Sequence, residues 1–64
     1  MNVYNGDMKR RDLEKRLAAV GWSFLRHGGA HDIWRKGTAT IPVPRHNEIN
    51  EHTARGILRT AGKE

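Results

Sequence analysis

The sequence predicts a small α+β domain with the element order α-β-β-β-α, in which a three-stranded antiparallel sheet carries two helices on one face. Three observations lead to this fold. Apolar residues recur with a helical period near both ends of the chain, the middle of the chain alternates in polarity, and glycines separate these segments. A chain of 64 residues is expected to form one domain with one thin core.

The first predicted helix covers residues 9–20 and has a strongly basic outer face. Its apolar positions recur at the spacing i, i+4, i+7: Leu13, Leu17 and Val20. Asp7 is the expected N-cap, and Gly21 stands where a left-handed C-terminal cap belongs. Residues 1–7 are expected to be a loose N-terminal leader before a single domain of residues 8–64, and both methionines remain candidates for the native start.

Three strands are expected between the helices, at residues 22–27, 30–35 and 38–43. Gly28 and Gly29 are expected to form a two-residue turn of the primed kind, because both positions can adopt positive φ. Gly37 marks the second turn. Pro42 has no N–H to donate, so the third strand is expected to lie at an edge of the sheet or to end there.

The second predicted helix covers residues 51–61, with Asn50 as its N-cap and Gly62 as its stop. Its apolar stripe consists of Ala54, Ile57, Leu58 and Ala61. A glycine inside a helix costs about 1 kcal/mol relative to alanine, so Gly56 suggests a close approach to a neighbouring element.

The two sides of the second strand are both of mixed character. One side carries His31, Ile33 and Arg35, and the other carries Asp32, Trp34 and Lys36. The sequence therefore leaves open which side faces the helices. Trp22 and Phe24 are expected in the core, whereas Trp34 either joins the core or points outward, where it could stack on an unpaired base.

The charge balance favours a polyanionic partner. Twelve Lys and Arg against seven Asp and Glu give a net charge of +5, and RNA or DNA is the commonest partner of so basic a small domain. The chain has no cysteine, which excludes disulfides and thiolate metal sites and fits a reducing cytoplasm. No apolar run approaches the roughly 18 residues of a membrane span, and no signal peptide is visible.

Among the four histidines, His31 is the candidate for proton transfer. It follows two glycines, which allow a backbone or a phosphate to come close. His46 ends the run of residues 42–46 and either binds phosphate or holds its loop, while His27 and His52 are most simply surface residues. The sequence has no HExxH motif and no acidic cluster beside these histidines, so we expect no metal site and no cofactor.

Four fragments in order resemble the HicA-type toxins, the small ribonuclease partners in bacterial and archaeal HicA–HicB toxin–antitoxin pairs. The fragments are Met8-Lys9-Arg10-Arg11-Asp12-Leu13 with Ala19-Val20-Gly21-Trp22, Gly28-Gly29-Ala30-His31, Ile41-Pro42-Val43-Pro44-Arg45-His46, and Ile57-Leu58-Arg59-Thr60-Ala61-Gly62. In the second fragment, Ala30 replaces the serine of the family's Gly-Ser-His signature. The resemblance extends from Met8 to Gly62.

This resemblance implies a fold like that of a double-stranded RNA-binding domain and puts His31 at the family's catalytic position in mRNA cleavage. It also implies a HicB antitoxin that covers the active region, and contact with operator DNA only through the antitoxin. Since RNA carries its own nucleophile, the 2′-hydroxyl, a histidine acting as general acid or base can suffice without a metal ion. The residues expected to contact RNA are Gly29, Arg26, Arg35, Lys36, Arg45 and His46.

The competing interpretation is a non-catalytic RNA-binding module with the same fold. Such modules read the A-form shape and the 2′-hydroxyls of duplex RNA through a basic helix face and a loop. A DNA-binding fragment is a third class, but no helix-turn-helix pair is visible.

Overall fold

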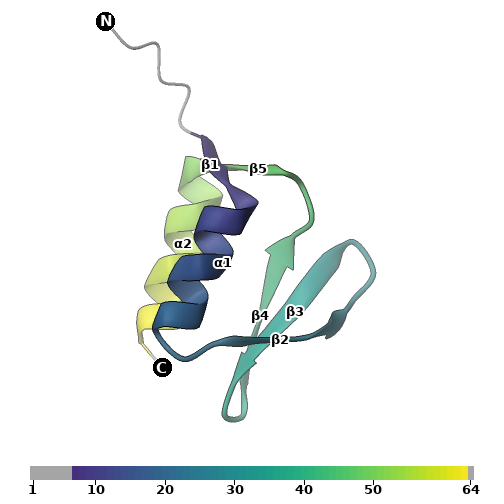
Figure 1. Cartoon of the computed structure of the whole chain (residues 1–64), viewed down its shortest axis with the longest axis vertical. Helices are drawn as coiled ribbons and strands as arrows, with labels where there is room; N and C mark the ends of the chain where they lie inside the picture. Colours follow the sequence, from purple (N-terminus) through teal and green to yellow (C-terminus); the bar gives the residue numbers. More distant parts are fainter. Residues whose placement is uncertain (1–6, 64) are drawn as a thin grey trace, which may run out of the picture.

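The computed structural model describes residues 7–63 and confirms the predicted fold class. The elements follow the order β1 (Asp7–Lys9), α1 (Arg10–Ala19), β2 (Ser23–His27), β3 (His31–Lys36), β4 (Ala39–Pro44), β5 (Glu48–Asn50) and α2 (Glu51–Gly62). Strands β2, β3 and β4 form an antiparallel sheet in that order, and both helices lie on one side of it (Figure 1). The edge position expected for the strand that contains Pro42 is therefore correct. No helix in residues 7–63 is long and apolar enough to span a membrane.

Two short strands, β1 and β5, were not predicted. They pair with each other in antiparallel register, with Met8 opposite Ile49. The expected N-cap at Asp7 is wrong, because this residue belongs to β1 and α1 begins after Lys9, which makes no side-chain cap. The amide of Arg10 at the start of α1 donates instead to the carbonyl of Asn47, at 2.8 Å. The remaining leader, residues 1–6, lies outside the described residues.

The helix ends differ in how well the sequence predicts them. Gly21 adopts φ of 99°, which confirms the left-handed cap expected there. Its amide donates to the carbonyl of Ala18 and the amide of Trp22 donates to the carbonyl of Leu17 at 3.0 Å, so the cap is a Schellman motif. Asn50 caps α2 by accepting from the amide of His52 at 2.8 Å. Gly62 is not the stop, because it is the last helical residue and lacks positive φ.

Gly56 does not mark a close approach. A Cβ built at this position would meet nothing within 4 Å. It lies instead beside a shallow groove of about 380 Å³ between α2 and β4, which Ile41 and Ile57 also line. The expectation from the sequence was therefore wrong.

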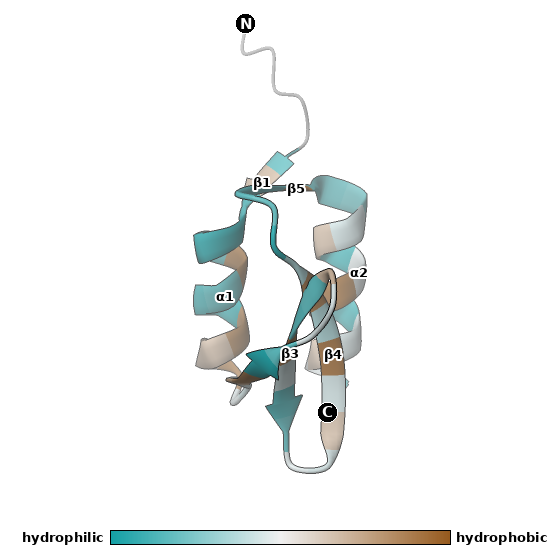
Figure 2. Cartoon of the chain, turned by 90° about the vertical axis from the view of Figure 1, so that its right-hand side faces the viewer, coloured by the Kyte–Doolittle hydropathy of each residue, from teal (hydrophilic) through white to brown (hydrophobic). Residues whose placement is uncertain are grey.

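The core lies between the helices and the sheet, where the apolar sides of both helices face inward (Figure 2). Its buried residues are Leu13, Leu17, Trp22, Trp34, Ile41, Val43, Ile49, Ala54 and Ala61. The side of β3 that faces the helices is thus the one with Asp32 and Trp34, and His31 and Arg35 are exposed on the other side. Trp22 is in the core as expected. Phe24 is not, because β2 packs mainly on β3 alone and leaves this residue 46% exposed.

Candidate active site

Two sequence motifs lie together at the end of the sheet where the chain turns from β2 into β3: the glycine run that ends at His31, and residues 42–46. His31 at the start of β3 pairs with Pro44 at the end of β4. The guanidinium of Arg45, the next residue, donates a hydrogen bond to the carbonyl of Gly29 in the turn. His31, Gly29 and Arg45, which were selected separately from the sequence, therefore meet at one end of the sheet.

The turn itself differs from the expected one. Residues 28–30 connect the strands, and neither Gly28 nor Gly29 adopts positive φ. Gly28 is needed for space: its amide donates to the carbonyl of His31 at 2.7 Å, and a Cβ on it would lie 2.8 Å from that oxygen. A Cβ built on Gly29 would have no heavy atom within 4 Å. The two-residue primed turn was therefore wrong, while the close approach of backbone at the glycines is confirmed for Gly28.

Arg45 is held by contacts on two sides. Its carbonyl accepts a hydrogen bond of 2.8 Å from Nη1 of Arg10 at the start of α1. Its guanidinium nitrogen Nη1 lies 3.6 Å from Oδ1 of Asp32. Together with the bond to the Gly29 carbonyl, these contacts fix one cationic group at the turn.

Asp32 is a buried charged residue beneath this turn, with 6% of its surface exposed. Its Oδ1 also lies 2.7 Å from Nδ1 of His27, whose side chain is 69% exposed. An ionised carboxylate only accepts, so Nδ1–H of His27 is the donor to it, and Nε2 has no hydrogen-bond partner in the described part of the chain. Sequence reasoning missed this pair and treated His27 as a surface residue. The strand register, which puts His27 directly opposite Asp32, is the signal that could have found it.

His31 presents its ring to solvent. It is exposed on the side of β3 away from the helices, opposite in direction to Asp32. Within residues 7–63 its ring has no hydrogen-bond or ion-pair partner. A phosphodiester could therefore approach it without displacing a protein group.

The other residues expected to bind RNA are distributed along the sheet. Arg26 is exposed and pairs with Ile33, so it shares the face of His31. Arg35 lies farther along this face, and His46 is exposed just after Arg45.

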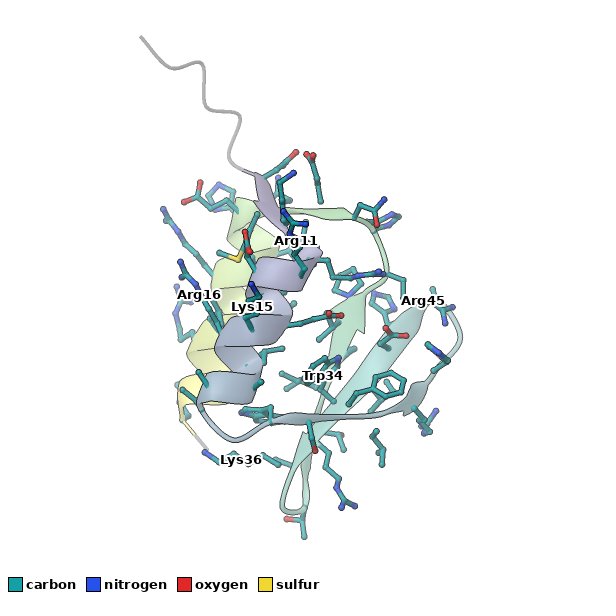
Figure 3. The ribbon with its side chains drawn as sticks, viewed as in Figure 1. Arg11, Lys15, Arg16, Trp34, Lys36 and Arg45 are labelled. Carbon is teal, nitrogen blue, oxygen red and sulfur yellow. The ribbon has the colours of Figure 1, made fainter. Side chains whose placement is uncertain are left out.

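Lys36 lies at the far end of β3, and its Cα is about 16 Å from that of His31 at ~3.3 Å per residue. A Cβ built on Gly21 would lie 3.1 Å from Cε of Lys36, so the aliphatic part of this side chain covers the end of α1. Figure 3 shows Lys36 far from Arg45.

A further basic surface covers the outer side of α1, as the sequence predicts. Arg11, Lys15 and Arg16 are exposed there and project from the helix (Figure 3). No group of three or more His, Cys, Asp or Glu side chains in residues 7–63 is arranged to hold a metal ion.

Comparison with known protein families gives one finding. Residues 10–63 match the family described as HicA toxin of bacterial toxin-antitoxin. The matched region runs from the start of α1 through α2 and therefore contains the β2–β3 turn, His31 and Arg45. Searches of curated proteins and of solved structures returned no match.

Proposed function

The chain belongs to the HicA toxin family, and we propose that it is a metal-independent endoribonuclease that cleaves mRNA. Membership makes it a toxin of a toxin–antitoxin system with an antitoxin as its partner. We propose that this antitoxin is of the HicB type and neutralises the toxin by covering the end of the sheet that carries His31. The observation that carries the proposal is the meeting of an exposed histidine, an open glycine turn and a fixed arginine within the matched region.

In this mechanism the RNA supplies the nucleophile. His31 takes the proton of the 2′-hydroxyl or gives one to the leaving 5′-oxygen, a role that imidazole can fill near neutral pH. The 2′-oxygen forms a bond to phosphorus while the bond to the 5′-oxygen breaks. The products are a 2′,3′-cyclic phosphate, or the phosphate from its hydrolysis, and a free 5′-hydroxyl.

Cationic groups must offset the charge that develops on the phosphorane. Arg45 supplies a fixed positive charge at the end of the sheet, where its contacts with Gly29 and Asp32 hold the guanidinium in position before RNA binds. Arg26, on the face of His31, supplies a second positive charge for the RNA backbone.

Incubation of the purified protein with an RNA oligonucleotide in excess chelator, beside its all-deoxy counterpart, tests the reaction. We expect cleavage of the RNA alone. The variant His31→Ala should stay folded and lose about 10²- to 10⁴-fold in rate, whereas His52→Ala, which removes an exposed histidine at the start of α2, should retain the rate of the parent. Cleavage of the deoxy strand, or cleavage that chelator abolishes, would show that the mechanism is wrong.

The partner is tested separately. A HicB-like reading frame beside this gene, whose product co-purifies with the toxin and stops RNA cleavage, is the expected result. A neighbouring protein of another class that blocks cleavage would contradict the HicB assignment and leave the ribonuclease activity standing.

A further inference from the structure

One large aromatic side chain stands outside the core next to the candidate site. Phe24 on β2 is 46% exposed, although its cross-strand partner Trp34 is buried. Its ring meets Trp34 edge-on at a centroid distance of 6.3 Å and His27 at 5.0 Å. These two contacts hold the ring in one orientation while about half of the residue remains open to solvent. An exposed aromatic ring that is fixed in this way is suited to stack on an unpaired nucleic-acid base.

The polar groups beside Phe24 are suited to a phosphate. His27 is oriented by its bond of 2.7 Å to the buried Asp32, its side chain is 69% exposed, and its Nε2 has no hydrogen-bond partner among residues 7–63. When the imidazole carries a proton on both nitrogens, Nε2–H donates to a phosphate oxygen and Asp32 balances the charge. The guanidinium of Arg45 lies on the other side of the same carboxylate, with Nη1 at 3.6 Å.

These observations point to a nucleotide subsite on the side of the sheet that faces the helices. We propose that Phe24 stacks on one unpaired base of RNA while His27, oriented by Asp32, donates to the adjacent phosphate. The inference rests on the proposed function, since it assumes that the chain acts on RNA. It narrows the substrate to single-stranded RNA, because a base inside a duplex is already stacked on its neighbours and offers no free face.

The turn connects this subsite with His31 on the opposite side of the sheet. Gly29 lies between them, has no side chain, and has open space where a Cβ would be. Arg45 donates to the Gly29 carbonyl and so lies on the path that a single strand would take around the end of the sheet. A strand bound in this way places the stacked base beside the cleavage point and not at it.

Binding of a single strand that cannot be cleaved tests the subsite. The probe is a 2′-O-methyl oligonucleotide of ten nucleotides, which lacks the nucleophile, and its Kd is measured by fluorescence anisotropy. We expect Phe24→Leu to raise this Kd about 5- to 150-fold with an unchanged salt dependence, because only stacking is lost. The matched control is Leu25→Ala, since Leu25 is the neighbouring apolar residue on β2 and is 41% exposed. Its Kd should stay within about twofold of the parent.

Two further measurements separate the parts of the subsite. His27→Gln should raise the Kd about 2- to 10-fold with an unchanged salt slope, because the pair of His27 and Asp32 contributes a hydrogen bond to the phosphate and no net charge. Oligonucleotides with one abasic position moved along the strand locate the stacked base. In the strand that lacks this base, Phe24→Leu should have no further effect.

The inference is overturned if Phe24→Leu binds the probe as tightly as the parent. It is also overturned if Phe24→Leu weakens binding equally for every position of the abasic site in the oligonucleotide. Equal weakening on single-stranded and duplex probes would also overturn it, since Phe24 would then act only through the fold. Failure of the proposed function is a different result, namely a parent protein that binds the probe and does not cleave RNA.

Discussion

Exchanging Gly28 for alanine should destabilise the protein and disturb the start of β3. The added Cβ would lie 2.8 Å from the carbonyl oxygen of His31, a backbone atom that cannot rotate away, and 3.3 Å from the side chain of Ile33. The turn must therefore open, which weakens the bond from the Gly28 amide to that carbonyl. Crowding of this kind costs about 1–3 kcal/mol. In a domain of this size each kcal/mol corresponds to roughly 4–8 °C in Tm.

The neighbouring glycine provides the matched control. A Cβ on Gly29 meets nothing within 4 Å and its φ is not positive, so Gly29→Ala should gain about 0.4–1 kcal/mol by restricting the unfolded chain. Thermal unfolding followed by circular dichroism measures both variants, and RNA cleavage at a temperature where both are folded measures the position of His31. A Gly28→Ala variant as stable as the parent, or a Gly29→Ala variant less stable than Gly28→Ala, would show that the close approach at Gly28 does not limit the turn.

Three further predictions concern other parts of the molecule. Asp32→Ala removes the buried carboxylate that contacts His27 and Arg45, and it should lower the free energy of unfolding by about 1–3 kcal/mol in urea titration. An unchanged free energy of unfolding would mean that these contacts do not stabilise the fold. Leu17→Ala, at a fully buried position of α1, should cost about 2–5 kcal/mol in the same measurement, and a smaller loss would indicate that the core closes around the change. Arg26→Ala and Arg45→Ala should each lower the slope of log Kd against log salt for single-strand RNA binding by about 0.7. Lys36→Ala, at the far end of β3, should change this slope less. Identical slopes in all three variants would show that RNA does not prefer the end of the sheet with the turn.

The elements that the sequence predicts correctly are those with a local signal. The helical period of Leu13 and Leu17 and the alternation around Trp34 are visible within ten residues, and they give α1 and the three-stranded sheet. Strands β1 and β5 have three residues each, too few to show alternation, and they exist because of a pairing between distant segments. No local pattern could reveal them.

Some residues of the candidate site could be predicted from local sequence motifs, and others depend on strand register or tertiary packing. The two motifs that end at His31 and His46 are visible in the sequence, and strand pairing explains why they meet. The pair of His27 and Asp32 depends on the register of β2 against β3, which the length of the turn sets and which the sequence interpretation placed incorrectly. The exposure of Phe24 depends on how far the helices extend over the sheet, which is a property of tertiary packing.

The prolines of β4 have a consequence for how the molecule behaves at high concentration. Pro42 and Pro44 lie opposite Ile33 and His31, and a proline within a paired strand must turn its nitrogen away from the partner strand. The outer edge of β4 therefore lacks two of the amide donors that a further strand would need, and Thr40 keeps the donor at the next outward position. This edge resists the strand-by-strand growth that leads small sheet proteins into fibres, so the chain can accumulate without its sheet extending through β4.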